Sequence, residues 1–208
     1  MDFSILIACY NEQDTISSVL EYLVTHYSQI PIIVVDNGST DDSARIIKSY
    51  PVHYVYEVTK GKGNAIRAGT KHITTLNVIL IDADNEYDPA GIKSLLNYSY
   101  DMKLATVGIR PAKSMLIRSR LANFLIRVIL WMRFNVWIKD CLSGLRLVPA
   151  SILKETTATG FAIETEINKL CLQQHILINE VPIDYKPRTI GKKIKARDMV
   201  HLTIEAMI

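Results

Sequence analysis

The stretch Val78-Ile79-Leu80-Ile81-Asp82-Ala83-Asp84 most constrains what this chain can fold into. Its consecutive apolar residues predict a short strand buried on both faces, as in a parallel sheet covered by helices. The strand ends in two carboxylates, and open α/β sheets bind ligands at the carboxyl ends of their strands. Two acids held there repel each other and lose hydration, so they need a cation nearby. Oxygen ligands of this kind suit Mg²⁺ or Mn²⁺ shared with substrate phosphates. The segment therefore predicts a site for a nucleotide diphosphate.

Short apolar runs alternate with helical patterns through the first hundred residues. Strands are predicted at 3–9, 31–35, 52–57, 77–82 and 103–108, and helices near 13–26, 41–49, 63–74 and 89–99. This alternation predicts an α/β fold with a mostly parallel, doubly wound sheet flanked by helices. Beyond residue 110 the pattern changes to a helix over about 114–135, a strand near 144–148, a helix near 163–173 and a strand near 176–184. No Gly/Ser-rich linker separates the halves, so we expect one catalytic domain over 1–191 and a basic amphipathic segment over 192–208.

Composition narrows the class of protein. With 208 residues, 49% of them hydrophobic, the chain is long enough for one substantial core. Cys9, Cys141 and Cys171 are far apart in apolar surroundings, which predicts buried thiols of a reducing compartment. We expect no signal peptide, because a strand begins almost at once, and no apolar run reaches the roughly 18 residues that span a bilayer. Lys and Arg gather at 110–139 and 186–197, which predicts an anionic partner for the second half.

Polar segments follow several predicted strands. Residues 9–12 (CYNE) and 36–41 (DNGSTD) follow the first two, and Lys60–Asn64 opens a helix. Side chains at strand ends should converge on one crevice. Gly61 and Gly63 would let the backbone approach a ligand, and the helix N-terminus would offer N–H groups to a phosphate. The dinucleotide fingerprint is absent, because its third glycine is missing, and no P-loop occurs.

Seven segments occur in one order: CYNE, VVDNGSTDDS, KGKGNAIRAG, LIDADNEYDP, DCLSGLRLV, GFAIETEI and EVPIDYKPRTIG. In this set the chain resembles family 2 glycosyltransferases of the GT-A fold, from Ser4 to about Lys195. Within that family it is most similar to polyprenyl-phosphate glycosyltransferases of the dolichyl-phosphate mannosyltransferase type and their UDP-sugar relatives. The resemblance implies a Rossmann-like catalytic domain with a helical elaboration on the acceptor side.

The resemblance also implies a role for each matched position. The nucleotide-sugar would contact Ala8, Tyr10, Glu12, Val35, Asp36, Asn37, Lys62, Asp82, Ala83 and Asp84, with the metal on Asp82 and Asp84. The acceptor or phosphate site would comprise Arg110, Arg120, Ser143, Arg188 and Lys193. The sugar pocket would comprise Asp140, Gly144 and Glu166, and the catalytic residues would be Asp140, Asp84 and Arg110. Glu164, next to this set, is expected on the helix surface.

Two departures from the family pattern bear on the substrates. Mannosyl-transferring relatives carry two aspartates where this chain has Asp36-Asn37. A carboxylate matches the adjacent donors of guanine, whereas an amide supplies both a donor and an acceptor. Asn37 therefore favours a UDP-sugar over GDP-mannose, although a GDP-sugar stays open. The second departure is Gly191-Lys192-Lys193-Ile194-Lys195, which keeps positive charge but lacks the serine that relatives carry.

An apolar segment interrupted by arginines suggests where the acceptor binds. Residues 116–138 suit a helix in a membrane interface, where arginine stems reach the headgroups and Trp131 and Trp137 favour the same zone. A second basic, apolar-striped segment lies within 192–208. We therefore expect peripheral attachment at the cytoplasmic face of a membrane, with a membrane-anchoring partner or homo-oligomer as further options, and no nucleic-acid partner. The stripe in 116–138 would equally suit a core or a dimer interface.

The expected reaction is inverting, metal-dependent transfer of a sugar from a nucleotide-diphosphate sugar to a polyprenyl or dolichyl phosphate. A phosphate is already anionic, so Asp140 would orient a substrate; with a hydroxyl acceptor it would be the base. One alternative is a soluble family 2 enzyme with a non-lipid hydroxyl or phosphate acceptor. A nucleotidyltransferase fits less well, because its first loop usually carries a Gly-rich basic signature and this one reads CYNEQDT. An inactive interaction module is disfavoured by the intact acids at 82, 84 and 140.

Overall fold

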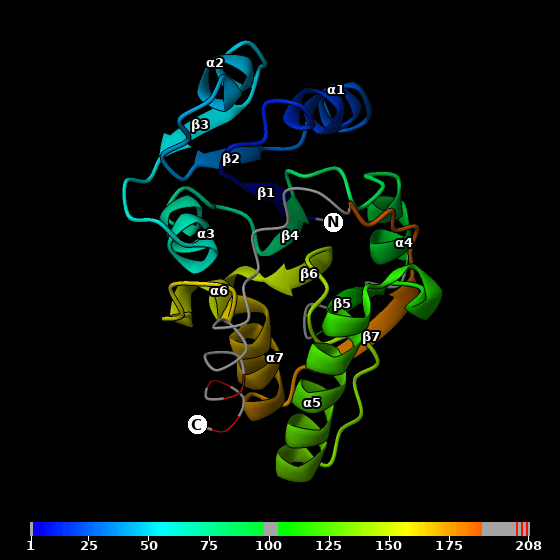
Figure 1. Ribbon diagram of the computed structural model, residues 1–208. Helices are drawn as coiled ribbons and strands as arrows, with labels where there is room; N and C mark the ends of the chain where they lie inside the picture. Colours follow the sequence, from blue (N-terminus) through cyan, green and yellow to red (C-terminus); the bar gives the residue numbers. More distant parts are fainter. Residues whose placement is uncertain (1, 98–103, 189–202, 204, 206, 208) are drawn as a thin grey trace.

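A seven-stranded sheet forms the centre of the molecule, in the order β3-β2-β1-β4-β6-β5-β7 (Figure 1). The computed structural model describes residues 2–97, 104–188, 203, 205 and 207. The strands are β1 (Phe3–Cys9), β2 (Ile32–Asp36), β3 (His53–Tyr56), β4 (Asn77–Asp82), β5 (Leu104–Ile109), β6 (Arg146–Pro149) and β7 (Leu177–Pro182). Only β6 is antiparallel to its neighbours, β4 and β5. The predicted mostly parallel α/β sheet is confirmed.

Helices cover both faces of the sheet. The first face carries α1 (Ile16–His26), α2 (Ser43–Lys48) and α4 (Gly91–Asn97), whose apolar side chains join one core cluster. The second face carries α3 (Lys62–Thr70), α6 (Ala150–Glu155) and α7 (Ile163–Gln173), which form a second cluster. In β4, Ile79 and Ile81 face the first cluster while Val78 and Leu80 face the second. This two-sided burial explains why the strand is a continuous apolar run.

A long helix, α5 (Ile117–Phe134), lies at the β5 and β7 end of the sheet (Figure 1). It buries Ile126 and Leu130 against Ile138, Cys141 and Ala162 in a third, smaller cluster. Large apolar side chains remain exposed along the helix: Ile117, Leu121, Phe124, Leu125, Trp131 and Met132. Within the described ranges, no helix has the length and apolarity needed to cross a membrane.

The predicted elements match the observed ones to within a few residues, with two differences. The chain forms a 3₁₀ turn over Ala112–Ser114 before α5, so that helix begins later than predicted. The short helix α6 was not predicted, because six residues give too little periodicity to separate a helix from a loop. Cys9, Cys141 and Cys171 are buried thiols, as predicted, and form no disulfide in the described part of the chain. The predicted segment 192–208, with Lys193, lies outside the described residues apart from positions 203, 205 and 207, which are helical.

Candidate active site

The carboxyl ends of β1, β2 and β4 meet where the strand order reverses. Strand pairing places Ala8 beside both Val35 and Asp82, and Cys9 beside Asp36. Such a reversal point is where doubly wound sheets bind ligands. The predicted convergence is therefore confirmed for the segments that follow these three strands, 9–12, 36–41 and 82–84.

Asp36, the last residue of β2, and Asn37 after it both hydrogen-bond to other parts of the protein. Asp36 is buried and accepts hydrogen bonds from the Ser39 N–H (2.8 Å) and the Tyr54 hydroxyl (3.0 Å). Burial, followed by this contact with Asp36, raises the pKa of Tyr54 to about 12. Asn37 donates to the carbonyls of Glu57 (3.1 Å) and Thr59 (2.7 Å). Its oxygen accepts from the Gly61 N–H at 2.7 Å. The Asn37 amide thus fixes the 57–61 turn, and the sequence argument that it reads uracil loses its support.

Tyr10 and Lys60 form the exposed side of this end of the crevice. The Lys60 ammonium lies 4.0 Å from the centre of the Tyr10 ring. It also donates to the Asn37 carbonyl at 3.1 Å, and Tyr10 stays 36% exposed. Lys60 thus packs over the Tyr10 ring, and the place of Tyr10 near the nucleoside stays a prediction.

The two acids after β4 are paired with different cations. An oxygen of Asp82 lies 2.5 Å from the Lys62 ammonium. An oxygen of Asp84 lies 3.6 Å from the Arg188 guanidinium. Burial, followed by repulsion from Asp82 and Glu86, raises the pKa of Asp84 to about 7 in spite of Arg188. The crevice therefore holds more closely spaced negative charge than its own cations neutralise.

Arg188 crosses the crevice to Glu12. Its guanidinium donates to both carboxylate oxygens of Glu12 at 2.7 Å, and its backbone N–H donates to Glu86 at 2.9 Å. Glu86 in turn accepts a hydrogen bond from the Tyr185 hydroxyl. Arg188, predicted to face a phosphate, and Glu12, predicted to line the nucleoside, are thus brought into direct contact.

Lys62 and Glu164 form a pair that the sequence did not reveal. The ammonium lies 2.5 Å from Glu164 as well as from Asp82, and the Glu164 side chain is 8% exposed. Burial alone would lower the pKa of Lys62, but attraction to Asp82 and Glu164 outweighs it and raises the pKa, so Lys62 stays charged. The expectation that Glu164 lies on the helix surface was wrong, because the second face of the sheet covers it.

The start of α3 is occupied by the protein's own carbonyls. Gly63 N–H donates to Gly160 and Asn64 N–H to Thr159, each at 3.1 Å. A Cβ on Gly61 would lie 2.1 Å from the Thr159 oxygen. Gly61 and Gly63 therefore allow residues 158–160 to pack closely against the start of α3. The expectation that the N–H groups at this helix start face a phosphate was wrong.

Replacing Gly63 by Ala should destabilise the fold by about 1–3 kcal/mol. The added Cβ would lie 2.0 Å from the Ala158 oxygen and 2.7 Å from its carbonyl carbon, and backbone cannot move aside as a side chain does. Urea unfolding measures the loss. Gly160→Ala is the control, because nothing lies within 4 Å of its Cβ, and we expect a change below about 0.5 kcal/mol. Equal effects of the two substitutions would contradict the close approach.

Glu166 holds the loop that packs on α3. Its carboxylate accepts from the N–H and hydroxyl of Thr157 (2.8 and 2.7 Å) and from the Ala158 N–H (2.9 Å). The side chain is 3% exposed. In this structure Glu166 faces the 157–158 backbone, which differs from the sugar contact that the resemblance implies.

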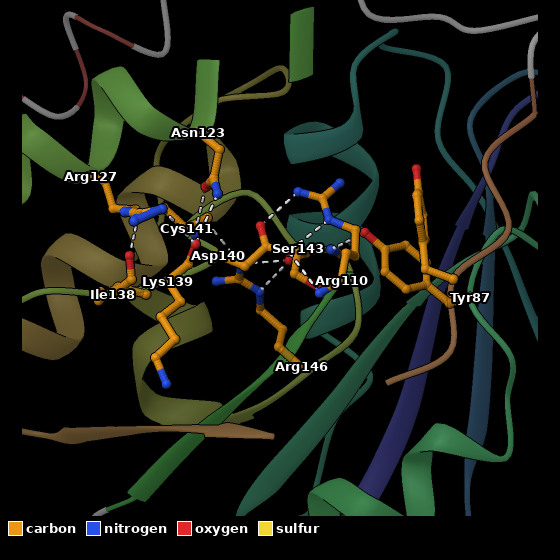
Figure 2. A network of polar contacts seen from close by, with 12 residues as sticks. Tyr87, Arg110, Asn123, Arg127, Ile138, Lys139, Asp140, Cys141, Ser143 and Arg146 are labelled. Atoms are coloured by element: carbon orange, nitrogen blue, oxygen red, sulfur yellow. Dashed lines mark hydrogen bonds and ion pairs between the residues drawn. The ribbon is translucent and has the colours of Figure 1, made fainter. Parts of the chain in front are cut away.

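Asp140 and Arg110 form a buried bidentate pair, visible in Figure 2. Arg110 Nε and Nη2 donate to the two oxygens of Asp140 at 2.8 and 2.7 Å, and the Arg110 N–H adds a third bond at 3.1 Å. Their side chains are 8% and 1% exposed. The predicted catalytic residues Arg110 and Asp140 therefore form an ion pair with each other. This pair lies on the side of the crevice next to α5.

Side chains from several elements hold the backbone of the 139–144 turn (Figure 2). Asn123 of α5 accepts from the Cys141 N–H at 2.8 Å and donates to the Lys139 carbonyl at 3.0 Å. Glu180 of β7 accepts from the Asp140 N–H at 3.2 Å. Fully buried Arg146 of β6 donates to the carbonyls of Ser143 (Nε, 3.0 Å) and Cys141 (3.3 Å). The turn that carries Asp140 is thus fixed by protein contacts.

Ser143 and Gly144 close this turn against Asp82. The Ser143 hydroxyl is buried and makes no hydrogen bond to the described part of the chain. The Gly144 N–H donates to the Tyr87 hydroxyl at 2.7 Å, and a Cβ on Gly144 would lie 2.3 Å from an Asp82 oxygen. A side chain at position 144 would therefore displace the Asp82 carboxylate.

Comparisons with known proteins identify the family to which this arrangement belongs. The family model described as Glycosyl transferase family 2 matches residues 4–156. The chain belongs to glycosyl transferase family 2. Glycosyltransferase AglJ of Haloferax volcanii is 29% identical over 196 residues, covering 90% of this chain, and the chain spans 64% of that protein's length. An uncharacterised protein, MJ0544 of Methanocaldococcus jannaschii, is 29% identical over 178 residues, covering 76% of this chain and 77% of its own.

Solved structures of glucosyl-3-phosphoglycerate synthase from Mycobacterium tuberculosis share the fold. One holds Mn²⁺, UDP and glucosyl-3-phosphoglycerate, with a TM-score of 0.76 at 20% identity, over 99% of this chain and 78% of the other. Another, with Mn²⁺, UDP-glucose and phosphoglyceric acid, has a TM-score of 0.80 at 19% identity and the same coverage. This family 2 domain is therefore a glycosyltransferase with the GT-A fold.

A groove of about 900 Å³ opens beside the Arg110–Asp140 pair of this glycosyltransferase. Its apolar lining comprises Ile109, Pro111, Ala112, Met115, Ile117, Leu121, Phe124 and Pro182. Its polar lining comprises Arg110, Arg120, Asn123, Arg127 and Lys139. Among these described lining residues none is acidic. The groove thus combines an apolar wall with four cationic side chains.

Arg146 and Glu180 were absent from the predicted site residues, and Glu164 was predicted on the helix surface. The available signal for Arg146 was a charged residue inside a predicted apolar strand, which needs buried partners to be tolerated. Glu164 and Glu180 gave no comparable signal, because their partners lie far away in the chain.

Proposed function

We propose that this family 2 glycosyltransferase transfers a sugar, with inversion, from a nucleotide-diphosphate sugar to a polyprenyl phosphate. The observation that carries the proposal is the groove along α5, whose apolar wall ends at the Arg110–Asp140 pair. An apolar groove suits an isoprenoid chain, and arginines suit its phosphate because they bind oxyanions in bidentate geometry. Arg120 lines the groove and would bind that phosphate, whereas Arg110 is bound to Asp140 and Arg127 stacks on Trp137.

The donor side fits a divalent metal. Asp82 and Asp84 supply hard oxygen ligands, and the raised pKa of Asp84 marks an excess of negative charge that a cation would relieve. Three-ligand metal clusters are absent from the described residues, and Mg²⁺ or Mn²⁺ shared with phosphates needs only one or two carboxylates. When bound, such an ion would neutralise the charge that develops on the leaving diphosphate. UDP-sugars are the first donors to test, because the M. tuberculosis structures of this fold hold Mn²⁺ with UDP or UDP-glucose.

A phosphate acceptor removes the need for a general base. One acceptor oxygen would attack the anomeric carbon as the bond to the diphosphate breaks, and that oxygen is already anionic. Asp140 accepts three hydrogen bonds from Arg110, which suits a carboxylate that positions groups in place of removing protons.

Peripheral attachment to a membrane surface forms part of the proposal. Leu121, Phe124 and Leu125 of α5 are 65%, 56% and 42% exposed, and Trp131 and Trp137 are each 47% exposed. Contiguous apolar surface beside cationic groups is typical of proteins that lie on anionic membranes. This surface continues from the groove, so a lipid acceptor would enter directly from the bilayer.

A second candidate keeps the donor and replaces the lipid by a small phosphate ester. It is favoured by the shared fold with a synthase crystallised with phosphoglyceric acid and with glucosyl-3-phosphoglycerate. The four cations of the groove would also suit a soluble phosphate, but the apolar wall would then have no role.

The test is transfer of radiolabel from a panel of UDP- and GDP-sugars, with Mn²⁺ or Mg²⁺, into organic-extractable polyprenyl phosphate. A parallel arm supplies 3-phosphoglycerate and follows label that stays in the aqueous phase. Label in the lipid supports the proposal and identifies the donor. Label only in the aqueous ester supports the second candidate, and absence of label from both arms contradicts the two together.

Arg120→Ala should raise the KM for polyprenyl phosphate about 10- to 100-fold and leave the KM for the donor within about twofold. The reason is that Arg120 lines the groove and makes no contact with the donor crevice in this structure. Arg118→Ala is the matched control, because Arg118 is exposed on the same helix and does not line the groove. Equal acceptor KM values for the two variants would place the acceptor phosphate elsewhere.

A further inference from the structure

The Lys62 ammonium is already paired with the Asp82 carboxylate, to which the proposed metal would bind. Its ammonium lies 2.5 Å from Asp82 and 2.5 Å from Glu164, with the three side chains 15%, 24% and 8% exposed. A partly buried ion pair resists exchange more than an exposed one, because water replaces its partner less readily. A divalent cation that approaches Asp82 therefore competes with a cation held by the fold.

The backbone of Lys62 has no freedom to withdraw from this position. Lys62 is the first residue of α3, and the neighbouring N–H groups of Gly63 and Asn64 are bound by Gly160 and Thr159. Glu166 fixes that loop through Thr157 and Ala158. Only the flexible side chain of Lys62 is able to move, so displacement from Asp82 leaves the ammonium within reach of the crevice.

Glu164 decides where the displaced ammonium stays. It lies on α7, opposite Asp82 across the ammonium, and the Arg146 guanidinium donates to its backbone carbonyl at 3.3 Å. When Asp82 binds another cation, Glu164 still neutralises the charge of Lys62. An incoming diphosphate then offers the ammonium a second anionic partner, since a lysine binds phosphate as a point charge.

We infer that Lys62 is an internal counter-ion of Asp82 which the metal must displace, and that Glu164 is the positioning residue that retains it for the donor diphosphate. The inference rests on the proposed function, because it takes Asp82 as a metal ligand. Its consequence is coupling: Mn²⁺ alone binds weakly, and a nucleoside diphosphate tightens Mn²⁺ binding by giving Lys62 a new partner.

Mn²⁺ binding to the purified chain, followed by the paramagnetic resonance signal of free Mn²⁺ with and without UDP, tests the inference. For Lys62→Met we expect affinity for Mn²⁺ alone to rise about tenfold, equivalent to about 1.4 kcal/mol. The factor by which UDP tightens Mn²⁺ binding should fall by a similar amount. Lys62→Arg keeps the cation and should stay within about threefold of the wild type. Glu164→Gln should weaken Mn²⁺ alone about threefold, because Lys62 then pairs only with Asp82.

Opposite shifts in the Lys62→Met and Glu164→Gln variants separate this mechanism from general damage to the fold, which would weaken binding in both. Lys169→Met and Glu155→Gln are the matched controls: Lys169 is a partly buried lysine paired with Glu205, and Glu155 is exposed. Unchanged or weaker binding of Mn²⁺ alone to Lys62→Met overturns the inference. Because these arms contain no acceptor, the expected Mn²⁺ shifts without any sugar transfer would refute the proposed reaction alone. Transfer without the shifts would refute the inference alone.

Discussion

Asp84→Asn is expected to lower sugar transfer at least about a thousandfold, equivalent to about 4 kcal/mol of transition-state stabilisation. The substitution removes one of the two carboxylates at the end of β4 that would hold a divalent ion against the diphosphate. Transfer of label under saturating donor and acceptor measures the loss. Asp14→Asn is the control, because Asp14 is exposed on the loop before α1 and outside the crevice, and its activity should stay within about twofold.

Thermal unfolding distinguishes this loss of function from loss of structure. Asp84 is held near Asp82 and Glu86, and burial with their repulsion raises its pKa to about 7. A neutral amide of the same shape relieves that repulsion, so the Tm of Asp84→Asn at pH 8 should equal or exceed that of the wild type. A variant that keeps more than a tenth of the wild-type activity would contradict the role of Asp84 in the donor site.

Arg146→Met is expected to destabilise the chain by about 3–5 kcal/mol, because it removes several buried hydrogen bonds from one charged donor at once. Arg146 is fully buried and donates to the carbonyls of Ser143, Cys141 and Glu164 and to the Asn168 side chain (3.1 Å). Methionine fills a similar volume but donates none of these hydrogen bonds, although the Cys141 carbonyl keeps a second donor, the Asn168 amide at 2.8 Å. Urea unfolding with an unchanged m-value measures the loss.

Arg45→Met is the matched control for this substitution. Arg45 pairs with Asp42 at 2.9 Å, but its side chain is 75% exposed, so we expect the urea midpoint to stay close to that of the wild type. Arg146→Met should also lower transfer, because the 139–144 turn carries Asp140. If Arg146→Met were as stable as Arg45→Met, the turn would be fixed by contacts other than the Arg146 guanidinium.

The contrast between Asp82 and Glu164 shows what separates predictable from unpredictable site residues. Asp82 was predicted because the local sequence determines its position. An apolar run forms a strand, and the acid at the end of that strand lies at the edge of the sheet. Glu164 lies in an ordinary helical pattern, and its burial depends on the packing of α7 against α3. Its partner Lys62 lies about a hundred positions earlier in the chain. No local pattern encodes a contact of that separation.

Asn37 and Gly63 illustrate a second limit. Residue type and spacing correctly marked both as part of the crevice segments, but several partners suit an amide or a glycine equally well. The backbone of 57–61 takes the hydrogen bonds of Asn37, and residues 158–160 fill the space beside Gly63. Asn37 and Gly63 thus contact the protein itself where ligand contacts were expected from the sequence, because the fold places those backbone groups next to them.

The sequence by itself determined the α/β class, the parallel sheet, nearly all elements, and the strand ends at which Ala8, Asp36 and Asp82 meet. These features follow from periodicity, burial and the direction of strands, which are local properties. Only the tertiary structure decided the Lys62–Glu164 pair, the Arg188–Glu12 contact, and the network around Asp140. Buried charges choose partners by distance in space, and that distance exists only after the helices have packed on the sheet.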